Sequence, residues 1–267
     1  MGTDPPNRST ELADFLAVLA QPGDDGHPFI VVGGQAANYW ANLYLEREPR
    51  LRAHLPFTSK DLDVIGSRES AVRVARTLGW QFSPPLVGGG LVQGVVSSGV
   101  PPKPLTVEFL SEIKGVPPDV IRDFARENTI RSEGNDRLVS VRVLDPAMLL
   151  YGKVRNAVDI GQDAPEKPRQ DVKHVAMLGL CVPHFLEELR AQAVDGPTRR
   201  EVCSNYVAMF ASLKNTYSGR RFEAEHPGTL RWAELIPETI RQMPLDDDTR
   251  RSLRQLEAVS RSRGMRI

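Results

Sequence analysis

Two aspartates, Asp61 and Asp63, stand two residues apart in an apolar segment that reads as a strand. Side chains alternate faces along a strand, so both carboxylates project to one side about 7 Å apart, while Leu62 and Val64 point into a core. Carboxylate oxygens at this spacing suit one or two hard cations, with water and phosphate as the other ligands. The same pattern is common at turns and solvated strand ends, so the pair needs support from other residues.

A Gly-Gly turn upstream of the pair supplies part of that support. Gly33 and Gly34 follow a short apolar strand over residues 29–32 and precede a helical pattern that begins at Gln35. Glycines at a helix start let phosphate groups approach the backbone N–H groups closely, and the helix dipole favours their negative charge. The alternative is a tight strand-to-helix turn that binds nothing.

A third acid, Glu108, lies in the strand-like run from Thr106 to Leu110. Val107 and Phe109 alternate with it, so Glu108 is expected on the polar face of a strand next to the aspartates. The alternative for Glu108 alone is an exposed edge glutamate. Together the glycines, the aspartates and this glutamate indicate a site for a metal ion and a phosphate.

The elements that must position these residues follow from periodicity and breakers. Helical patterns cover residues 11–19, 35–46, 67–78 and 117–128, and Asp145-Pro146 opens another helix; strand patterns cover 29–32, 91–96, 105–110 and 138–144, and residues 47–57 read as an irregular loop. A charged connector at 162–168 leads to helices at 170–178 and 183–193 and to more helix from residue 198. We expect an α+β fold with a core domain over 1–145 and a helical domain over 146–267.

Composition sets the class of protein. The 34 basic residues equal the 34 acidic ones, so the whole chain has no general attraction to nucleic acid or membrane, although local basic patches are possible. No apolar run approaches the 18 residues of a membrane span, and the start of the chain lacks a signal pattern, so we expect a cytoplasmic protein without membrane contact. Cys181 and Cys203 are expected to be reduced core residues. The arginine-rich C-terminus is either a solvated helix face or a surface that binds nucleic acid or a partner.

The order of these motifs carries a resemblance. Gly33-Gly34, then Ser59-Lys60-Asp61-Leu62-Asp63, then a third acid resembles the nucleotidyltransferase fold of the DNA polymerase beta type. The Ser-Lys-Asp-Leu-Asp form, followed by a helix containing Lys153 and a segment containing Asp171, is similar to the nucleotidyltransferase toxins of abortive-infection and toxin–antitoxin systems. The resemblance spans about residues 29–178. It departs from the family pattern at Glu108, where aspartate is common, at Val154, where leucine is usual, and before Asp171, where a basic residue is usual.

The resemblance implies a nucleotidyltransferase-type mixed sheet flanked by helices, followed by a mainly helical C-terminal region. It implies Mg²⁺ or Mn²⁺ as cofactor and an NTP as substrate. The metal ligands would be Asp61, Asp63 and Glu108, and the nucleotide-binding residues would be Gly33, Gly34, Ser59, Lys60 and Lys153. Lys153 would neutralise phosphate charge, and Asp171 would hold Lys153 in place through a salt bridge. From the residues alone, Lys153 is equally a surface lysine and Asp171 an acid favoured by a helix N-terminus.

The implied function is transfer of a nucleoside monophosphate from an NTP to a hydroxyl of RNA, such as tRNA, or of a protein. The implied biological role is that of a growth-inhibiting toxin, with a cognate antitoxin as a candidate partner. Two alternatives stay open. One is the same chemistry on a small-molecule acceptor, as in antibiotic nucleotidyltransferases, which the neutral net charge favours over a large RNA substrate. The other is a catalytically silent protein of this fold that binds a nucleotide or a partner.

Overall fold

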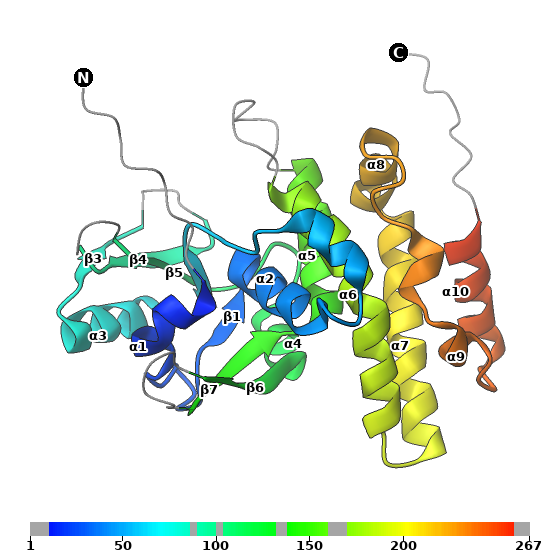
Figure 1. Cartoon of the computed structure of the whole chain (residues 1–267), viewed down its shortest axis with the longest axis horizontal. Helices are drawn as coiled ribbons and strands as arrows, with labels where there is room; N and C mark the ends of the chain where they lie inside the picture. Colours follow the sequence, from blue (N-terminus) through cyan, green and yellow to red (C-terminus); the bar gives the residue numbers. More distant parts are fainter. Residues whose placement is uncertain (1–10, 86–89, 100–103, 132–137, 160–169, 259–267) are drawn as a thin grey trace. The chain divides into compact units, whose positions relative to one another are not determined.

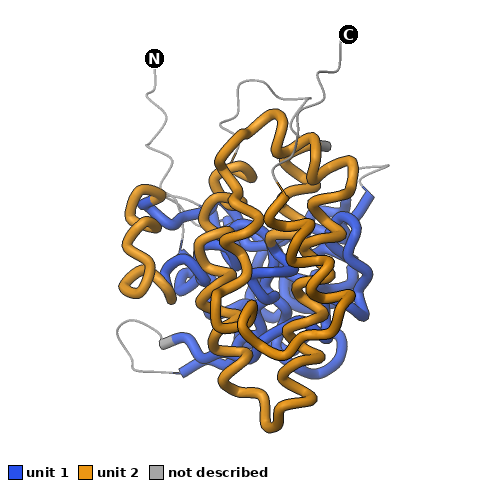
Figure 2. Tube along the Cα trace, turned by 90° about the vertical axis from the view of Figure 1, so that its right-hand side faces the viewer, with its two compact units in different colours: residues 1–42, 55–149 blue, residues 43–54, 150–267 orange. Residues whose placement is uncertain are grey.

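The computed structural model describes residues 11–85, 90–99, 104–131, 138–159 and 170–258. The connector predicted at 162–168 and the C-terminal arginines Arg261 and Arg263 lie outside these ranges. The chain forms two compact units, which Figure 2 shows in two colours. The first unit comprises Met1–Asn42 and Leu55–Leu149, and the second comprises Leu43–His54 and Leu150–Ile267.

The first unit is built on a mixed sheet, and Figure 1 labels its strands except β2. Its described strands are β1 (Ile30–Val32), β2 (Leu62–Ile65), β3 (Gln81–Ser83), β4 (Val92–Ser97), β5 (Thr106–Leu110), β6 (Ala125–Arg131) and β7 (Leu138–Leu144). They lie in the order β3-β4-β5-β2-β1-β7-β6. The β5–β2 and β1–β7 pairs are parallel and the other four are antiparallel. The expected α+β class and mixed sheet are therefore confirmed.

Alternate residues of a strand point to the same side of a sheet, and on one side of this sheet the residues of neighbouring strands are apolar. The buried residues of β2 and β5 on this face are Leu62, Val64, Val107 and Phe109. Helix α3 (Arg68–Leu78) packs on the adjoining strand β4, where a Cβ at Gly94 would lie 2.5 Å from the Phe82 ring and 3.4 Å from the Ala71 Cβ. The absence of a side chain at Gly94 thus lets the ring and the helix approach the sheet.

The remaining helices of the first unit follow the local patterns. They are a 3₁₀ helix η1 (Leu12–Phe15), α1 (Leu16–Leu19), α2 (Gly33–Tyr44), which continues into the second unit, and α4 (Pro118–Asp123). Helix α3 has the predicted caps: the Ser67 side chain accepts a hydrogen bond from the Ser70 N–H, and Gly79 closes the helix in the left-handed region. Helix α5 (Pro146–Asp159) begins as predicted, since Asp145 accepts from the Met148 N–H at 2.8 Å.

Three predictions of secondary structure are wrong. The helix expected over 117–128 ends at Asp123, and 125–131 form the edge strand β6, whose charged residues suit an exposed edge. The loop expected over 47–57 contains a 3₁₀ helix η2 (Pro49–His54) with Leu51 buried. The helices expected at 170–178 and 183–193 are one helix, α6 (Gln170–Gln192), with Pro183 inside it. Burial of its apolar neighbours offsets the hydrogen bond that proline removes.

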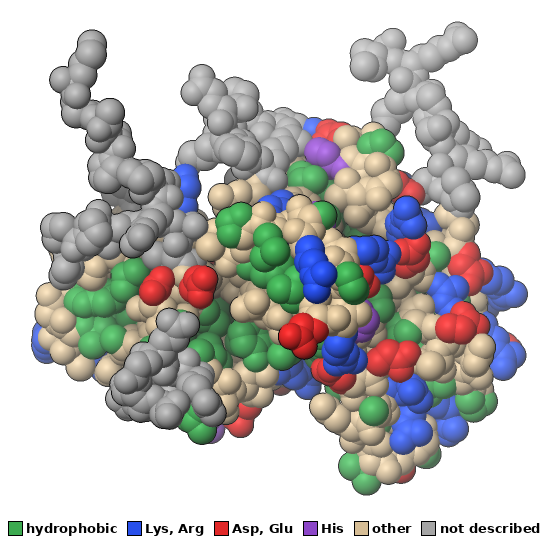
Figure 3. Space-filling model, viewed as in Figure 1, with side chains coloured by type: hydrophobic (Ala, Val, Ile, Leu, Met, Phe, Trp, Pro, Cys, Tyr) green, Lys and Arg blue, Asp and Glu red, His purple; other side chains and the backbone are tan. Residues whose placement is uncertain are grey.

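The second unit is helical, as predicted for the C-terminal region. After α6 it contains α7 (Gly196–Asn215), α8 (Tyr217–Glu225), a 3₁₀ helix η3 (Trp232–Leu235), α9 (Glu238–Arg241) and α10 (Asp247–Glu257). Cys181 and Cys203 are buried free thiols here, as expected. Basic and acidic side chains are interspersed over these helices in Figure 3. In the described part of the chain, no helix has both the length and the apolar character that a membrane crossing requires.

Two tethers organise this helical unit. Tyr44, at the end of α2, donates a hydrogen bond to Glu188 of α6 at 2.8 Å and stacks on His184 of α6, which joins the segment 43–54 to that helix. The buried Lys214 Nζ of α7 donates to the backbone carbonyls of Gln255, Leu256 and Ala258 at 3.0, 3.0 and 2.6 Å. A positive charge at the C-terminal end of α10 is favourable because the carbonyls there lack helical partners.

Candidate active site

The candidate site lies on the face of the sheet opposite to α3, where one row of residues crosses four strands. Val95 of β4, Glu108 of β5, Asp63 of β2 and Val32 of β1 are successive cross-strand partners. Residues directly opposite each other point to the same side, so the Asp63 and Glu108 carboxylates are neighbours. The alternation that predicted an apolar Leu62 and Val64 beneath Asp63 is confirmed, since both are fully buried.

Asp63 packs directly on the start of α2. A Cβ built on Gly33 would lie 1.7 Å from Asp63 Oδ2 and 2.6 Å from its carboxyl carbon, so only glycine leaves room for this carboxylate. Gly33 also has φ +66°, a conformation that glycine adopts without strain. The sequence indicated a turn at Gly33 but not this contact, which depends on the antiparallel register of β1 and β2.

Asp61 lies in the bend just before β2 and not within the strand, which corrects its expected position. The buried Ser59 hydroxyl donates to Asp61 Oδ1 across a long 3.4 Å contact, whereas Lys60 between them is exposed. Burial raises the pKa of Glu108, and the charge on Asp61 raises it further. Asp61 therefore acts electrostatically on Glu108, so the three acids form one group.

The first turn of α2 lies beside this acidic group. Gly33 and Gly34 open a helix of 12 residues, so backbone N–H groups that have no partner within the helix, and the positive end of the helix dipole, are next to Asp63. Trp40, two turns further along α2, donates from its indole nitrogen to the Leu144 carbonyl of β7 at 2.8 Å. That buried bond fixes the helix against the sheet and with it the position of the glycines.

The three acids do not form a closed metal cage. Among the described residues, no group of three His, Cys, Asp or Glu side chains is arranged to hold a metal ion by itself. Mg²⁺ usually takes only one or two protein carboxylates and completes its shell with water and substrate phosphate. Oxygen donors at Asp61, Asp63 and Glu108, with the Asp63 carboxylate seated against Gly33, fit such an open site.

Lys153 and Asp171 lie in the second unit, and the expected salt bridge between them is present. Lys153 Nζ of α5 donates to Asp171 Oδ1 of α6 at 2.6 Å, and the lysine side chain is only 13% exposed. The neighbouring His174 is buried, and burial together with the positive charge of Lys153 lowers its pKa to about 3. His174 is therefore neutral at physiological pH and packs in the core.

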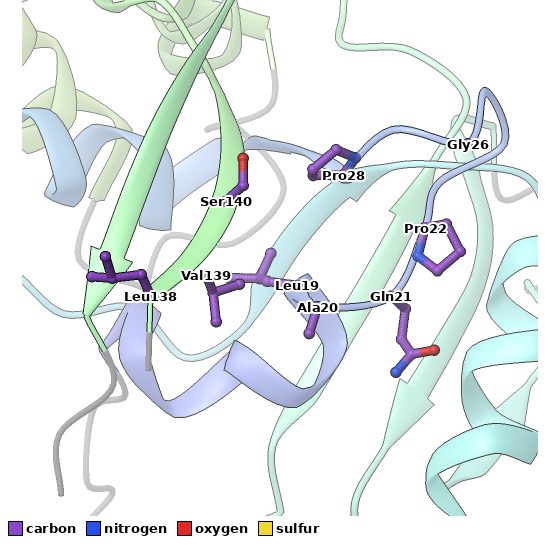
Figure 4. A pocket seen from close by; sticks show the side chains of 9 residues that line it. All are labelled: Leu19, Ala20, Gln21, Pro22, Gly26, Pro28, Leu138, Val139 and Ser140. Carbon is purple, nitrogen blue, oxygen red and sulfur yellow. The ribbon is translucent and has the colours of Figure 1, made fainter. Parts of the chain in front are cut away.

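A cavity of about 290 Å³ lies elsewhere in the first unit. Figure 4 shows its lining residues, which include Pro28 just before β1 and Leu138 at the start of the parallel strand β7, so the cavity lies at the other end of β1 from Gly33. Among the described residues its lining is apolar except for Gln21 and Ser140. This cavity offers no charged group for a metal or a phosphate and is not assigned to the site.

Comparison with known proteins does not identify the chain. No protein-family model matches this sequence, and no curated protein matches it either. Any assignment of function therefore has to come from the geometry of the acids and of the helix start beside them.

Proposed function

We propose that this protein is a Mg²⁺-dependent nucleotidyltransferase that moves a nucleoside monophosphate from an NTP to an acceptor hydroxyl. The observation that carries the proposal is the contact between Asp63 and Gly33, with Glu108 in the next strand position. It puts a cluster of carboxylates, which attracts cations, beside a helix N-terminus, which attracts anions. A metal–triphosphate complex carries a cation and an anion side by side, and few other ligands do.

Each residue of the site has a separate role in this proposal, set by its position. Asp61 and Asp63 would hold the metal ion of a metal–triphosphate complex, and the backbone N–H groups at Gly33 and Gly34 would donate hydrogen bonds to its phosphate oxygens. The metal, when bound, withdraws charge from the phosphates and lowers the pKa of the acceptor hydroxyl. Glu108, the third oxygen donor of the metal site, has a pKa raised by burial and by Asp61, so this carboxylate is also suited to take the proton from that hydroxyl. The hydroxyl oxygen bonds to the α-phosphorus, the bond to the β-phosphate oxygen breaks, and pyrophosphate leaves.

Residues outside the acidic cluster support the nucleotide. The buried Ser59 hydroxyl lies at the Asp61 carboxylate and can turn to a phosphate, and the exposed Lys60 can reach one from solvent. Within the second unit, the 2.6 Å bond to Asp171 fixes the ammonium of Lys153, the lysine for which the resemblance implies a role in neutralising phosphate charge. The arrangement of β1, β2 and β5, with β1 antiparallel and β5 parallel to β2, supports the nucleotidyltransferase type of fold.

The acceptor in this proposal is a hydroxyl of RNA, with tRNA as the first candidate, or of a protein. The growth-inhibiting role, the antitoxin partner and the cytoplasmic location belong to the same proposal. Induced expression of the wild-type chain should then slow growth, whereas the Asp61→Ala variant should not.

A labelled-transfer assay tests the activity. The purified protein is incubated with Mg²⁺, each α-³²P-labelled NTP in turn and total cellular RNA, and label is followed into RNA, protein and small-molecule fractions. Transfer that requires Asp61, Asp63 and Glu108 supports the proposal, and the fraction that gains label identifies the acceptor class, including a small molecule.

The matched control for Asp61→Ala is Asp119→Ala, since Asp119 is an exposed acid in the first turn of α4. It should transfer label at the wild-type rate. An absence of transfer from all four NTPs, or transfer that survives Asp61→Ala, would refute the proposal. Mg²⁺-dependent binding of an NTP without transfer would identify the catalytically silent alternative.

A further inference from the structure

The second unit contains a cavity of about 200 Å³ with a basic rim. Its lining brings together Arg50 and His54 of η2, Gly179 of α6, and Arg231 and Glu234 at the start of η3. These residues come from three separate stretches of the second unit. At ~30 Å³ per water molecule, the cavity has room for a phosphate group and part of its hydration shell.

The cavity already holds one oxyanion between two guanidinium groups. Arg231 donates to Glu234 Oε1 at 2.9 Å, and Arg50 Nη1 lies 3.5 Å from Glu234 Oε2. Each carboxylate oxygen therefore faces a different arginine. A phosphate group matches this arrangement because arginine binds phosphate and carboxylate oxygens through the same planar set of N–H donors.

The Glu234 carboxylate can leave its position between the two arginines. Its side chain is 49% exposed, so it can turn into water when another anion enters. Arg50 is held on its other side by Glu48, which accepts from Arg50 Nε at 2.8 Å and from Nη2 at 2.7 Å. The guanidinium of Arg50 is thus fixed in place, with Nη1 directed toward Glu234.

The floor of the cavity is shaped for close approach. A Cβ at Gly179 would lie 2.8 Å from Leu230 Cδ1, so glycine lets the segment before Arg231 lie against α6. His54 is partly buried at the rim, and burial and the nearby charge of Lys173 lower its pKa. A neutral imidazole can donate one hydrogen bond to a phosphate oxygen. Lys173 lies one turn before Ala176, another lining residue, on the same helix.

We propose that this cavity is a phosphate-binding site. In it, Arg50, Arg231 and His54 donate hydrogen bonds to the oxygens of a phosphate group that takes the place of the Glu234 carboxylate. The site lies wholly within the second unit and does not rest on the proposed transfer reaction. Its ligand is either a free phosphate, including that of a mononucleotide, or a phosphate of a polynucleotide backbone, and the two have the same oxyanion chemistry.

The test measures binding of inorganic phosphate to the full-length protein by isothermal titration at constant ionic strength. Arg231→Gln should weaken phosphate binding about fivefold, the size expected for one partly exposed charge contact. Glu234→Gln should tighten it, because the competing carboxylate is gone. That gain is informative because a folding defect does not produce it.

The matched control is Arg251→Gln. Arg251 is 66% exposed and pairs with Asp248 three residues away, as Arg231 is 68% exposed and pairs with Glu234 three residues away. It should leave phosphate binding unchanged. A second arm replaces phosphate with a short single-stranded oligonucleotide without terminal phosphates; tighter binding than inorganic phosphate, with the same response to both variants, identifies backbone phosphate.

Weaker binding of the oligonucleotide identifies free phosphate as the ligand. The proposal is overturned by an absence of binding in both arms. It is also overturned if Arg231→Gln and Glu234→Gln leave binding within twofold of wild type, or if Arg251→Gln weakens it as much as Arg231→Gln does.

Discussion

Replacing Glu108 by glutamine should make the protein more stable while removing the proposed activity. Glu108 is a carboxylate on β5 directly beside Asp63 on β2, and its pKa is raised by burial and by Asp61. Glutamine keeps the shape of the side chain and removes its charge. The repulsion among the three acids is therefore reduced without leaving a cavity.

The expected gain follows from strand geometry. Adjacent strands lie about 4.8 Å apart, which puts the Asp63 and Glu108 carboxylates about 6 Å from each other. Two like charges at that distance repel by ~0.7 kcal/mol in bulk water and by ~3 kcal/mol at an effective dielectric constant of 20. Because this face of the sheet is only partly buried, we expect about 1 kcal/mol, or an increase in Tm of roughly 2–4 °C.

The gain should depend on pH in a defined direction. The folded pKa of Glu108 lies above its unfolded value of about 4.3, so the folded wild type binds this proton more tightly than the unfolded chain does. Wild-type stability is therefore lost as the pH rises from the unfolded pKa through the folded one. Glu108→Gln does not titrate, so its advantage should be absent below the unfolded pKa and complete at pH 8.

Thermal unfolding in EDTA at pH 4 and at pH 8 checks this expectation. Glu127→Gln is the control, because Glu127 is an exposed glutamate of β6 in the same sheet, and it should give no gain at pH 8. Added Mg²⁺ should narrow the difference, since a cation stabilises the wild-type cluster more than the variant. Our account of the cluster would be refuted by a Glu108→Gln variant that is no more stable than wild type at pH 8 without metal.

Two further predictions concern glycine and lysine. Gly33→Ala should destabilise the protein by about 2–4 kcal/mol in urea unfolding, because its Cβ meets Asp63 and its φ is positive. Gly79→Ala, at the same φ of +66° but with open space around its Cβ, should cost only ~1 kcal/mol; equal losses would contradict the Asp63 contact. Lys214→Met should lower the free energy of unfolding by about 2–3 kcal/mol, because three backbone carbonyls lose their charged donor. The variant should also be cut first in α10 during limited proteolysis. Protection of α10 equal to that in the wild type would argue against this tether.

Local patterns were enough to predict most elements of the first unit. Ser67 and Gly79 bound α3 as their types suggest, and alternation along β5 gave the correct polar face for Glu108. Strand β6 could not be predicted this way because an edge strand carries charges on both faces and lacks an apolar alternation. The unbroken α6 was missed because the local cost of Pro183 is offset by tertiary burial, which periodicity does not report.

The candidate site was predictable as a set of residues but not as a geometry. Residue type and spacing identified Asp61, Asp63 and Glu108. The contact between Asp63 and Gly33 depends on the register of β1 and β2, in which the partners Val32 and Asp63 are 31 positions apart in the sequence. Arg50 and Arg231 meet through folding of the helical unit, and a pairing across that sequence distance has no local signal.

The segment 43–54 has a consequence for how this chain can be made and cut. It interrupts the first unit in sequence, yet Tyr44 and Glu48 bond to Glu188 and His184 of α6, well over a hundred residues later. During synthesis these residues leave the ribosome long before their partners exist, so the second unit cannot finish folding until α6 has followed. A fragment that begins at residue 150 would lack one wall of its own core, and no single cut in the chain separates the two units.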